Sequence, residues 1–274
     1  MIEIKSIIKE FSIRLESMTD KEKQAELDRL DIETYNEAVG DMDKVDGIHC
    51  DICKNKGMVK DLVDGRVIVR QCACIGHRHS YMNARNSGLG HYLQKGLDDY
   101  IVTDEWQAEC FEKMQSFVTA HGKDNTWFVA LGQSGCGKTL MGSIIANYLL
   151  YVEKRMVYYL TWTDFIGKLK RDMMGDKTND VSGYLDKIKK VDVLFIDEML
   201  KKYNDTDLRY LIEIINYRYT NDLKTIITSE NVYEKLLDID EATFGRMIEK
   251  SKDYLINIPK DRKKNYRLKG VRRE

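Results

Sequence analysis

The second half of the chain alternates between two patterns of apolar residues. Short continuous apolar runs predict buried strands, and apolar residues at helical spacing between them predict helices. The expected strands cover 127–131, 156–160, 191–196 and 224–228, and the expected helices cover 106–118, 138–151, 163–174 and 207–220. This alternation predicts an α/β fold, with a parallel sheet covered on both faces by helices. Ligands of such sheets bind at the carboxyl ends of the strands.

The first hundred residues follow other patterns. From Ile2 to about Val39, apolar residues recur at helical spacing among many charges, which predicts two amphipathic helices. Residues 47–80 contain short β-like runs on either side of Asp64-Gly65, a dipeptide that favours a hairpin turn. A polar, glycine-containing stretch follows. We therefore expect an N-terminal domain over 1–80, a linker over 81–100 and a larger domain over 101–274.

Composition and charge narrow the class of protein. The 274 residues are 43% apolar, enough for a sizeable core, and 44 basic against 45 acidic residues leave a net charge of -1. The charges are unevenly spread. Residues 1–48 hold 13 acidic and 7 basic residues, whereas 250–274 hold 10 basic and 3 acidic ones, so the two ends should prefer different partners.

Neither a membrane span nor an export signal is visible. No stretch approaches the roughly 18 uninterrupted apolar residues that a membrane helix requires, and the opening MIEIKSIIKEF lacks a long apolar centre. We therefore expect a cytoplasmic protein that does not enter membranes. In that reducing compartment the six cysteines are expected to bind metal or to be buried, not to form disulfides.

The sequence from Gly132 to Thr139 reads GQSGCGKT, which matches the phosphate-binding pattern G-x-x-x-x-G-K-[ST]. It lies between an expected strand and an expected helix, the context that this motif requires. Its backbone N–H groups would face phosphate oxygens, Lys138 would reach the β and γ phosphates and assist catalysis, and Thr139 would bind Mg²⁺. The residues assigned to nucleotide binding are Gly132, Gln133, Ser134, Gly135, Cys136, Gly137, Lys138 and Thr139, with no chemistry of its own for Cys136. The alternative is a glycine-rich turn with an accidental GKT.

Two acidic residues follow the expected strand VDVLFI. Asp197 would hold the magnesium shell, and Glu198 is placed to orient and deprotonate an attacking water. A hydrolase requires that second role, whereas a small-molecule kinase does not. The alternative is an acidic pair that merely caps the strand.

Four cysteines form two close pairs within the 47–80 segment. Cys50 and Cys53 are separated by two residues, and Cys72 and Cys74 by one, with eighteen residues between the pairs. Four thiolates on two facing turns suit a tetrahedral, structural Zn²⁺ site. The second pair is tighter than the usual spacing, so nearby histidines are possible substitutes: His49, His77 and His79. The alternative is four reduced cysteines in an ordinary small fold. Cys110, on a helix face, is instead expected to be a buried core residue.

Taken together, the cysteine module, the GKT loop and the VDVLFIDE strand resemble the replicative-helicase loaders of the DnaC/DnaI type, particularly phage-encoded forms. The resemblance extends over about residues 47–270, including LIEIINYRYTNDLKTIITSE and FGRMIE. It implies an AAA+ ATPase that binds the hexameric replicative helicase through its N-terminal domain and helps place it on single-stranded DNA.

The resemblance also implies roles for individual residues. Arg246 in FGRMIE corresponds to the arginine finger that reaches the nucleotide of a neighbouring subunit, which implies a homo-oligomer; the alternative is an arginine on a helix surface. Thr228 and Ser229 occupy the place of a nucleotide sensor, where many AAA+ proteins have asparagine. Ser229 and Arg267 are thereby expected to contact the nucleotide.

Both ends of the chain are candidate interaction segments. The acidic helices of 1–39 are expected either to contact the helicase or to pack on the zinc module. The basic tail from Lys260 could contact DNA phosphates, with Tyr266 available for base stacking, or could be a solvated charged end. The competing functions are an IstB-like ATPase assisting DNA transposition, a P-loop small-molecule kinase and a non-catalytic nucleotide-binding adaptor.

Overall fold

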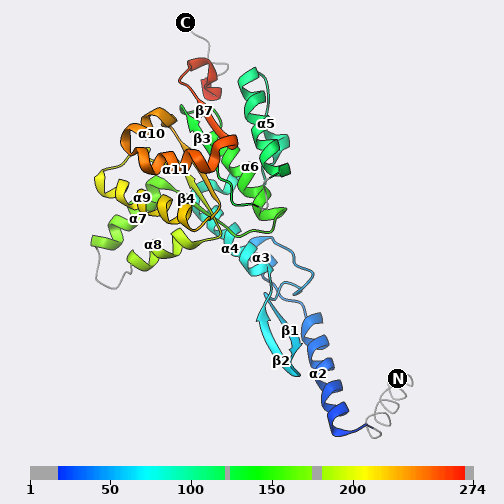
Figure 1. Ribbon diagram of the computed structural model, residues 1–274. Helices are drawn as coiled ribbons and strands as arrows, with labels where there is room; N and C mark the ends of the chain where they lie inside the picture. The colour runs from blue at the N-terminus through cyan, green and yellow to red at the C-terminus, as the bar shows by residue number, and fades with distance from the viewer. Residues whose placement is uncertain (1–17, 121–123, 175–180, 269–274) are drawn as a thin grey trace. The chain divides into compact units, whose positions relative to one another are not determined.

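The structure is a computed structural model that describes residues 18–120, 124–174 and 181–268 (Figure 1). The chain divides into two compact units, Met1–Arg78 and His79–Glu274, and helix α4 (Cys74–Ala84) runs through the boundary. The first helix expected from the sequence, over the residues before 18, lies outside the described residues. None of the helices within the described ranges has the length and apolar character needed to cross a membrane.

The first unit is built from a helix and a hairpin. Its elements are α2 (Asp20–Glu37), α3 (Asp43–Asp46), β1 (Met58–Val63) and β2 (Arg66–Gln71). Strands β1 and β2 pair antiparallel from Met58 opposite Gln71 to Val63 opposite Arg66. Asp64 and Gly65 turn the chain with φ values of 49° and 72°, as the two positive φ angles of a tight hairpin turn require.

Helix α2 is attached to the hairpin through backbone groups of β1. The side-chain amide of Asn36 donates to the carbonyl oxygen of Lys60 at 2.9 Å and accepts from its N–H at 2.9 Å. The ammonium of Lys60 pairs with Asp31 at 2.7 Å. No described residue of α2 is buried, so this helix is held by polar contacts to an edge strand and not by an apolar core.

The second unit contains a five-stranded parallel sheet. Its strands are β3 (Phe128–Gly132), β4 (Val157–Thr161), β5 (Val193–Asp197), β6 (Thr225–Ser229) and β7 (Leu255–Ile258), in the order β4-β5-β6-β3-β7. Every neighbouring pair is parallel. The predicted α/β fold is confirmed. The edge strand β7 was not expected, because only four residues form it.

Helices cover both faces of this sheet (Figure 1). They are α5 (Glu105–Ala120), α6 (Lys138–Tyr151), α7 (Trp162–Met174), α8 (Val181–Lys190), α9 (Asp205–Thr220), α10 (Tyr233–Ile239) and α11 (Glu241–Ser251). Successive residues of a strand face opposite ways. Phe128 and Ala130 accordingly join the core formed with α5 and α6, whereas Val129 and Leu131 join the core formed with α7, α9 and α11.

Residues 81–100, which the sequence pattern suggests are a linker, pack against the sheet as part of the second unit. Ala84, Leu89 and Leu93 are buried in the same core as α6. The side chain of Asn83 accepts a hydrogen bond from the N–H of Tyr159 at 2.6 Å, so it satisfies a backbone group of the edge strand β4. Polar side chains in this segment form hydrogen bonds with the backbone of an edge strand, and a polar sequence of this kind is typical of a loop.

Candidate functional site

The phosphate loop joins the end of β3 to the start of α6. Gly132, Gly135 and Gly137 have φ values of 138°, 81° and 90°, and Gly137 is the N-cap of α6. These angles belong to a region that favours glycine, so the three glycines are required for this turn. The loop thereby directs the positive end of α6 toward the space where a phosphate would lie.

Lys138 and Thr139 are the first two residues of α6, and the side chains of both form hydrogen bonds beside the phosphate loop. The ammonium of Lys138, which is buried, donates to the carbonyl oxygen of Gln133 at 2.7 Å. The hydroxyl of Thr139 donates to Asp197 Oδ1 at 3.0 Å. These two hydrogen bonds hold both side chains beside the phosphate loop.

Asp197 ends β5 beside the phosphate loop. It is 4% exposed and also accepts a hydrogen bond from the hydroxyl of Thr228 at the end of β6. Burial raises the pKa of its carboxyl, although the hydrogen bonds from Thr228 and Thr139 act in the opposite direction. A carboxylate and a hydroxyl oxygen at this spacing fit the ligand set that Mg²⁺ prefers.

Glu198 follows Asp197 and is half-buried on the cleft wall. Its φ of 54° turns the chain at the end of the strand, and its N–H donates to the Thr228 hydroxyl at 3.1 Å. The carboxylate pairs with Lys201 at 2.6 Å, and Lys201 lies 3.9 Å from Glu230. Glu198 therefore lines the cleft with a positioned backbone, and its carboxylate is held in an ion pair with Lys201.

The two candidate sensor residues point in different directions. Thr228 contacts Asp197 and lines the cleft. The hydroxyl of Ser229 instead donates to the carbonyl oxygen of Met199 at 2.6 Å, and Ser229 is absent from the cleft lining among the described residues. The alternation of side chains along β6 explains this difference. Of the two residues that the resemblance places at the sensor position, Thr228 is therefore the one whose side chain contacts Asp197.

A cleft of about 280 Å³ extends from the phosphate loop to a group of aromatic residues. At the loop end it is lined by Lys138, Thr139 and Glu198. At the other end it is lined by Tyr92, Tyr100 and Trp106. The sequence pattern does not reveal this aromatic end, because Tyr92 and Tyr100 lie in the polar 81–100 segment and only their aromatic character sets them apart.

The two candidate arginines lie in different surroundings. Arg267 lines the cleft, with Nη1 at 3.5 Å from the Ser134 hydroxyl. Arg246 is exposed on α11, donates to Asn216 Oδ1 at 2.6 Å and lies over the ring of Tyr219. Arg246 is not one of the described residues that line this cleft. Its exposed side chain is held by Asn216 and Tyr219 of the same chain.

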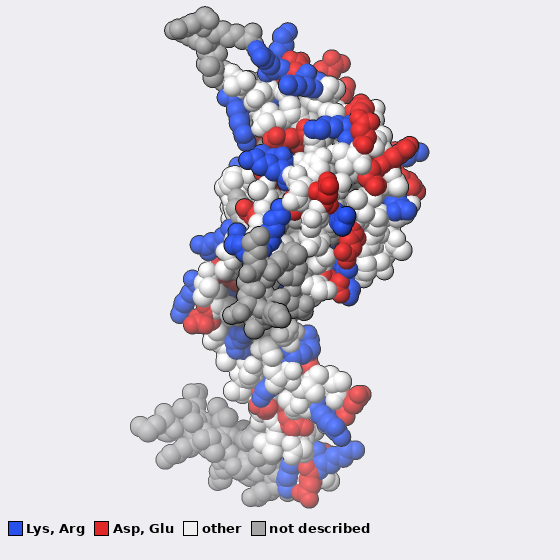
Figure 2. Space-filling view, turned by 90° about the vertical axis from the view of Figure 1, so that its left-hand side faces the viewer, with Lys and Arg blue, Asp and Glu red and all other residues white. Residues whose placement is uncertain are grey.

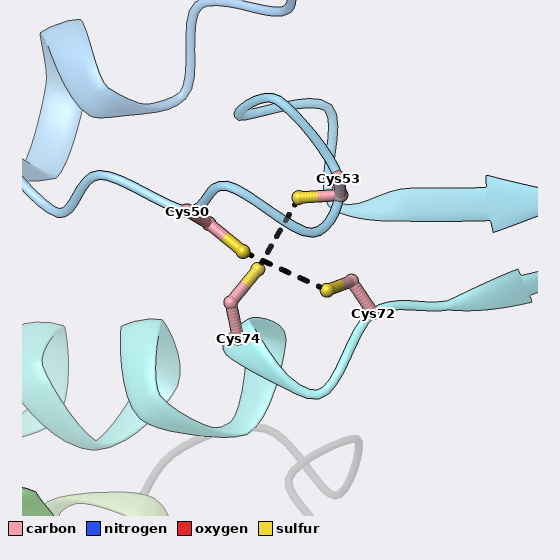
Figure 3. A group of neighbouring side chains, drawn as sticks. All are labelled: Cys50, Cys53, Cys72 and Cys74. Carbon is pink, nitrogen blue, oxygen red and sulfur yellow. Dashed lines mark hydrogen bonds between the residues drawn. The ribbon is translucent and has the colours of Figure 1, made fainter. Parts of the chain in front are cut away.

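The four paired cysteines of the first unit converge on one point (Figure 3). Their sulfur atoms all lie within 4.8 Å of one another, with 3.8 Å between Cys50 and Cys72 and 3.6 Å between Cys53 and Cys74. A tetrahedron with metal–sulfur bonds of about 2.3 Å has edges of about 3.8 Å. All four are free thiols, so the cluster fits a metal ion. It is complete without His49, His77 or His79.

The backbone around the first cysteine pair supports this arrangement. The N–H of Gly57 donates to Cys53 Sγ at 3.2 Å, and the side chain of Asn55 accepts from the N–H of Cys50 at 2.8 Å. Arg78, which is 2% exposed, forms an ion pair with the buried Asp46 and donates to the carbonyl oxygen of Ile48 at 2.6 Å. These contacts fix the chain that carries the sulfurs.

Acidic and basic side chains are interspersed on the face drawn in Figure 2. That face carries no broad single-sign patch among the described residues, in keeping with the net charge of -1.

The β4-β5-β6-β3-β7 sheet, the phosphate loop and the Asp197-Glu198 pair define a P-loop ATPase domain of the AAA class. Residues 128–247 match the family described as ATPase family associated with various cellular activities (AAA). This class supports ATP hydrolysis as the general activity of the domain.

Known proteins define the relationship further. The chain is 30% identical over 237 residues to the phage-like element PBSX protein XkdC of Bacillus subtilis (strain 168), covering 81% of this chain and 87% of XkdC, and it belongs to the same family. It is also 30% identical over 213 residues to YqaM of that organism, 73% of this chain but only 66% of YqaM. The replicative helicase loader DnaC of Buchnera aphidicola subsp. Baizongia pistaciae (strain Bp) is 25% identical over 197 residues, 71% of this chain and 72% of that protein.

A solved structure shares the fold. The crystal structure of the DnaC helicase loader superposes with a TM-score of 0.53 at 22% identity, covering 61% of this chain and 99% of that chain. The resemblance to DnaC-type loaders expected from the motifs is therefore confirmed, with relatives encoded by a phage-like element.

Proposed function

We propose that this protein is an ATP-dependent loader that binds a replicative DNA helicase and helps place it on single-stranded DNA. The observation that carries the proposal is the arrangement of Lys138, Thr139 and Glu198 around one cleft, with Asp197 bonded to Thr139, in a chain related to DnaC. The proposed helicase partner is inferred from this relative, which is named a replicative helicase loader. The ATP site gives such a loader a means of changing state.

The hydrolytic step follows from the residues around the cleft. Lys138 would leave the Gln133 carbonyl oxygen and bind the β and γ phosphates, while the loop N–H groups hold the phosphate oxygens. Thr139 and Asp197 would hold Mg²⁺, which neutralises charge that develops on the phosphates. Glu198 would orient a water and accept its proton. We assign catalysis to Glu198, Lys138 and, from a neighbouring subunit, Arg246.

Arg246 motivates the proposed assembly. It is exposed and lies outside the cleft of its own chain, so it would act on the nucleotide of a second copy. A guanidinium that arrives only on assembly makes turnover depend on the oligomer. In this proposal the protein is therefore active as a homo-oligomer.

The first unit is the proposed helicase-binding part, held by Zn²⁺ at Cys50, Cys53, Cys72 and Cys74. The hairpin and α2 have little apolar core of their own, and a metal would supply the missing stability. The hairpin also exposes apolar side chains, with Leu62 55% and Val69 50% exposed. Such a surface suits a protein partner.

The test is association with the replicative helicase of the same host. We expect a complex in size-exclusion chromatography, and we expect ATP to change its stability or its affinity for single-stranded DNA. A chain with Lys138→Ala serves as the nucleotide control, since it should still bind helicase but not respond to ATP. Absence of a complex both with and without ATP would overturn the proposal.

A further inference from the structure

Beyond β7 the chain returns to the phosphate loop. We call residues 259–268 the C-terminal strap; it contains two short 3-10 turns, Arg262–Lys264 and Tyr266–Leu268. The side chain of Gln133 donates to the carbonyl oxygen of Asp261 and accepts from the N–H of Asp261 at 2.8 Å. The N–H of Tyr266 donates to the carbonyl oxygen of Gly135 at 2.8 Å. Three hydrogen bonds thus join the strap to the loop.

The fit between strap and loop is close at Gly135. A Cβ atom there would lie 2.0 Å from Asn265 Oδ1, so any other residue would force the Asn265 side chain to move. The same oxygen accepts a hydrogen bond from the N–H of Arg267 at 3.1 Å. Asn265 therefore closes a turn within the strap, and the absence of a side chain at Gly135 makes room for it.

The strap also forms part of the cleft wall. Tyr266 and Arg267 line the cleft that holds Lys138 at one end and Trp106 at the other. Lys264 lies over the Trp106 ring, with its ammonium 5.7 Å from the ring centroid. In Figure 1 the red turns after β7 lie beside the start of α5, which carries Trp106. Tyr266 is 51% exposed, so an aromatic surface remains accessible at this wall.

We propose that the C-terminal strap is part of the nucleotide site, with Tyr266 as the wall that meets the base of an adenosine nucleotide. This proposal rests on the proposed ATP binding. It adds Tyr266 as a contact of the base and the C-terminal strap as a segment whose position depends on nucleotide. We call the strap seated when it is hydrogen-bonded to the phosphate loop. A base that contacts Tyr266 stabilises the seated strap, and the seated strap in turn raises the affinity for nucleotide, because such linkage is reciprocal. The hydrogen bonds at Gln133 and Gly135 connect the phosphate end of the cleft to the same segment.

The strap offers its own readout, because it contains five sites for trypsin: Lys260, Arg262, Lys263, Lys264 and Arg267. We expect saturating ADP to slow cleavage at these sites by about fivefold or more, since trypsin requires an unseated segment. Pyrophosphate should protect them less, because it fills the phosphate loop but has no base to meet Tyr266. Cleavage is followed by mass spectrometry of the full-length chain.

Calorimetric titration with ADP separates the two possible failures. If ADP binds but leaves the cleavage rates unchanged, the strap proposal is wrong while the ATP site stands. If ADP does not bind at all, the proposed ATPase function is itself contradicted.

Substitution of the tyrosine tests the wall directly. Tyr266→Ala should weaken ADP binding by about fivefold or more, the size expected for loss of one base–aromatic stack, and should leave pyrophosphate binding unchanged. Tyr266→Phe should restore ADP affinity. Tyr203→Ala is the matched control, since Tyr203 is also exposed but lies outside this cleft. Equal ADP affinity in Tyr266→Ala and the unmodified chain would overturn the proposal.

Discussion

The hydroxyl of Thr139 donates to Asp197 Oδ1 at 3.0 Å, although 58 residues separate the two along the chain. Thr139 lies in the first turn of α6 and Asp197 is the last residue of β5. Parallel strands bring both to the same edge of the sheet, so the hydroxyl and the carboxylate meet there.

Glu198→Gln should separate binding from turnover. The amide keeps the shape of the side chain but cannot accept the proton of water, so ATP hydrolysis should fall about a hundredfold or more while ATP affinity stays within about twofold. Phosphate release and calorimetry measure the two quantities. Glu234→Gln, at an exposed position on α10, is the matched control and should leave both unchanged. Unaltered hydrolysis in Glu198→Gln would exclude this carboxylate as the base.

Arg246→Ala should affect only the assembled protein. Because Arg246 lies outside its own cleft, ATP binding by the monomer should be unchanged, while turnover should fall about a thousandfold or more in the oligomer. Hydrolysis is measured across protein concentrations that span the assembly transition. Lys250→Ala, on the same helix, is the control. A loss of ATP binding in the monomer would contradict the role assigned to Arg246.

Thr228 and Ser229 should respond differently to removal of the hydroxyl. Thr228→Val removes a hydrogen bond to Asp197 at the cleft, so hydrolysis should fall about tenfold or more. Ser229→Ala removes a bond to the Met199 backbone and should lower the free energy of unfolding by about 1 kcal/mol, with little change in hydrolysis. Steady-state kinetics and urea unfolding distinguish the two. The reverse pattern would restore Ser229 as the sensor.

The purified protein should contain one zinc ion per chain. Cys53→Ser should lose that zinc and unfold the first unit, because a metal held by four thiolates contributes folding energy directly. Elemental analysis gives the zinc content, and amide hydrogen exchange reports the order of β1 and β2. His49→Ala should retain the zinc, since the four sulfurs form the cluster without it. Zinc-free protein with an ordered hairpin would show that the cysteines are structural on their own.

Lys224 should make stability depend on pH in the alkaline range. Its side chain is fully buried, and burial lowers the pKa of its ammonium to about 8, although Asp124 at 3.6 Å opposes this. Between about pH 8 and pH 10.5 the unfolded chain holds a proton that the folded chain has released, so this group makes the folded state more stable as pH rises. Its share of the rise is up to about 3 kcal/mol.

Lys224→Met isolates that contribution. Urea unfolding of the two proteins from pH 7.5 to pH 9.5 should show the unmodified chain gaining stability relative to the variant as pH rises, because methionine does not titrate. Other groups that titrate in both proteins contribute equally to the two curves and cancel in the comparison. Parallel curves would show that the Lys224 pKa is not lowered by folding.

The sequence by itself determined the features that depend on local spacing. The glycines of residues 132–139 fix a turn whatever surrounds them, the continuous apolar strands require a sheet buried on both faces, and the close cysteine pairs can meet across one hairpin. These features were sufficient to predict the AAA fold and the relationship to DnaC-type loaders. Each of these features depends on residues that are close together in the sequence.

Only the tertiary structure decided which side chains face the cleft. Thr228 and Ser229 are neighbours with similar hydroxyls, and the register of β6 against β3 and β5 turns one to Asp197 and the other to Met199. The 81–100 segment reads as a polar linker because its partners are backbone groups of an edge strand formed some 75 residues later. Tyr266 meets the phosphate loop only because β7 brings the end of the chain alongside β3. Such contacts join distant parts of the chain, and no local pattern encodes them.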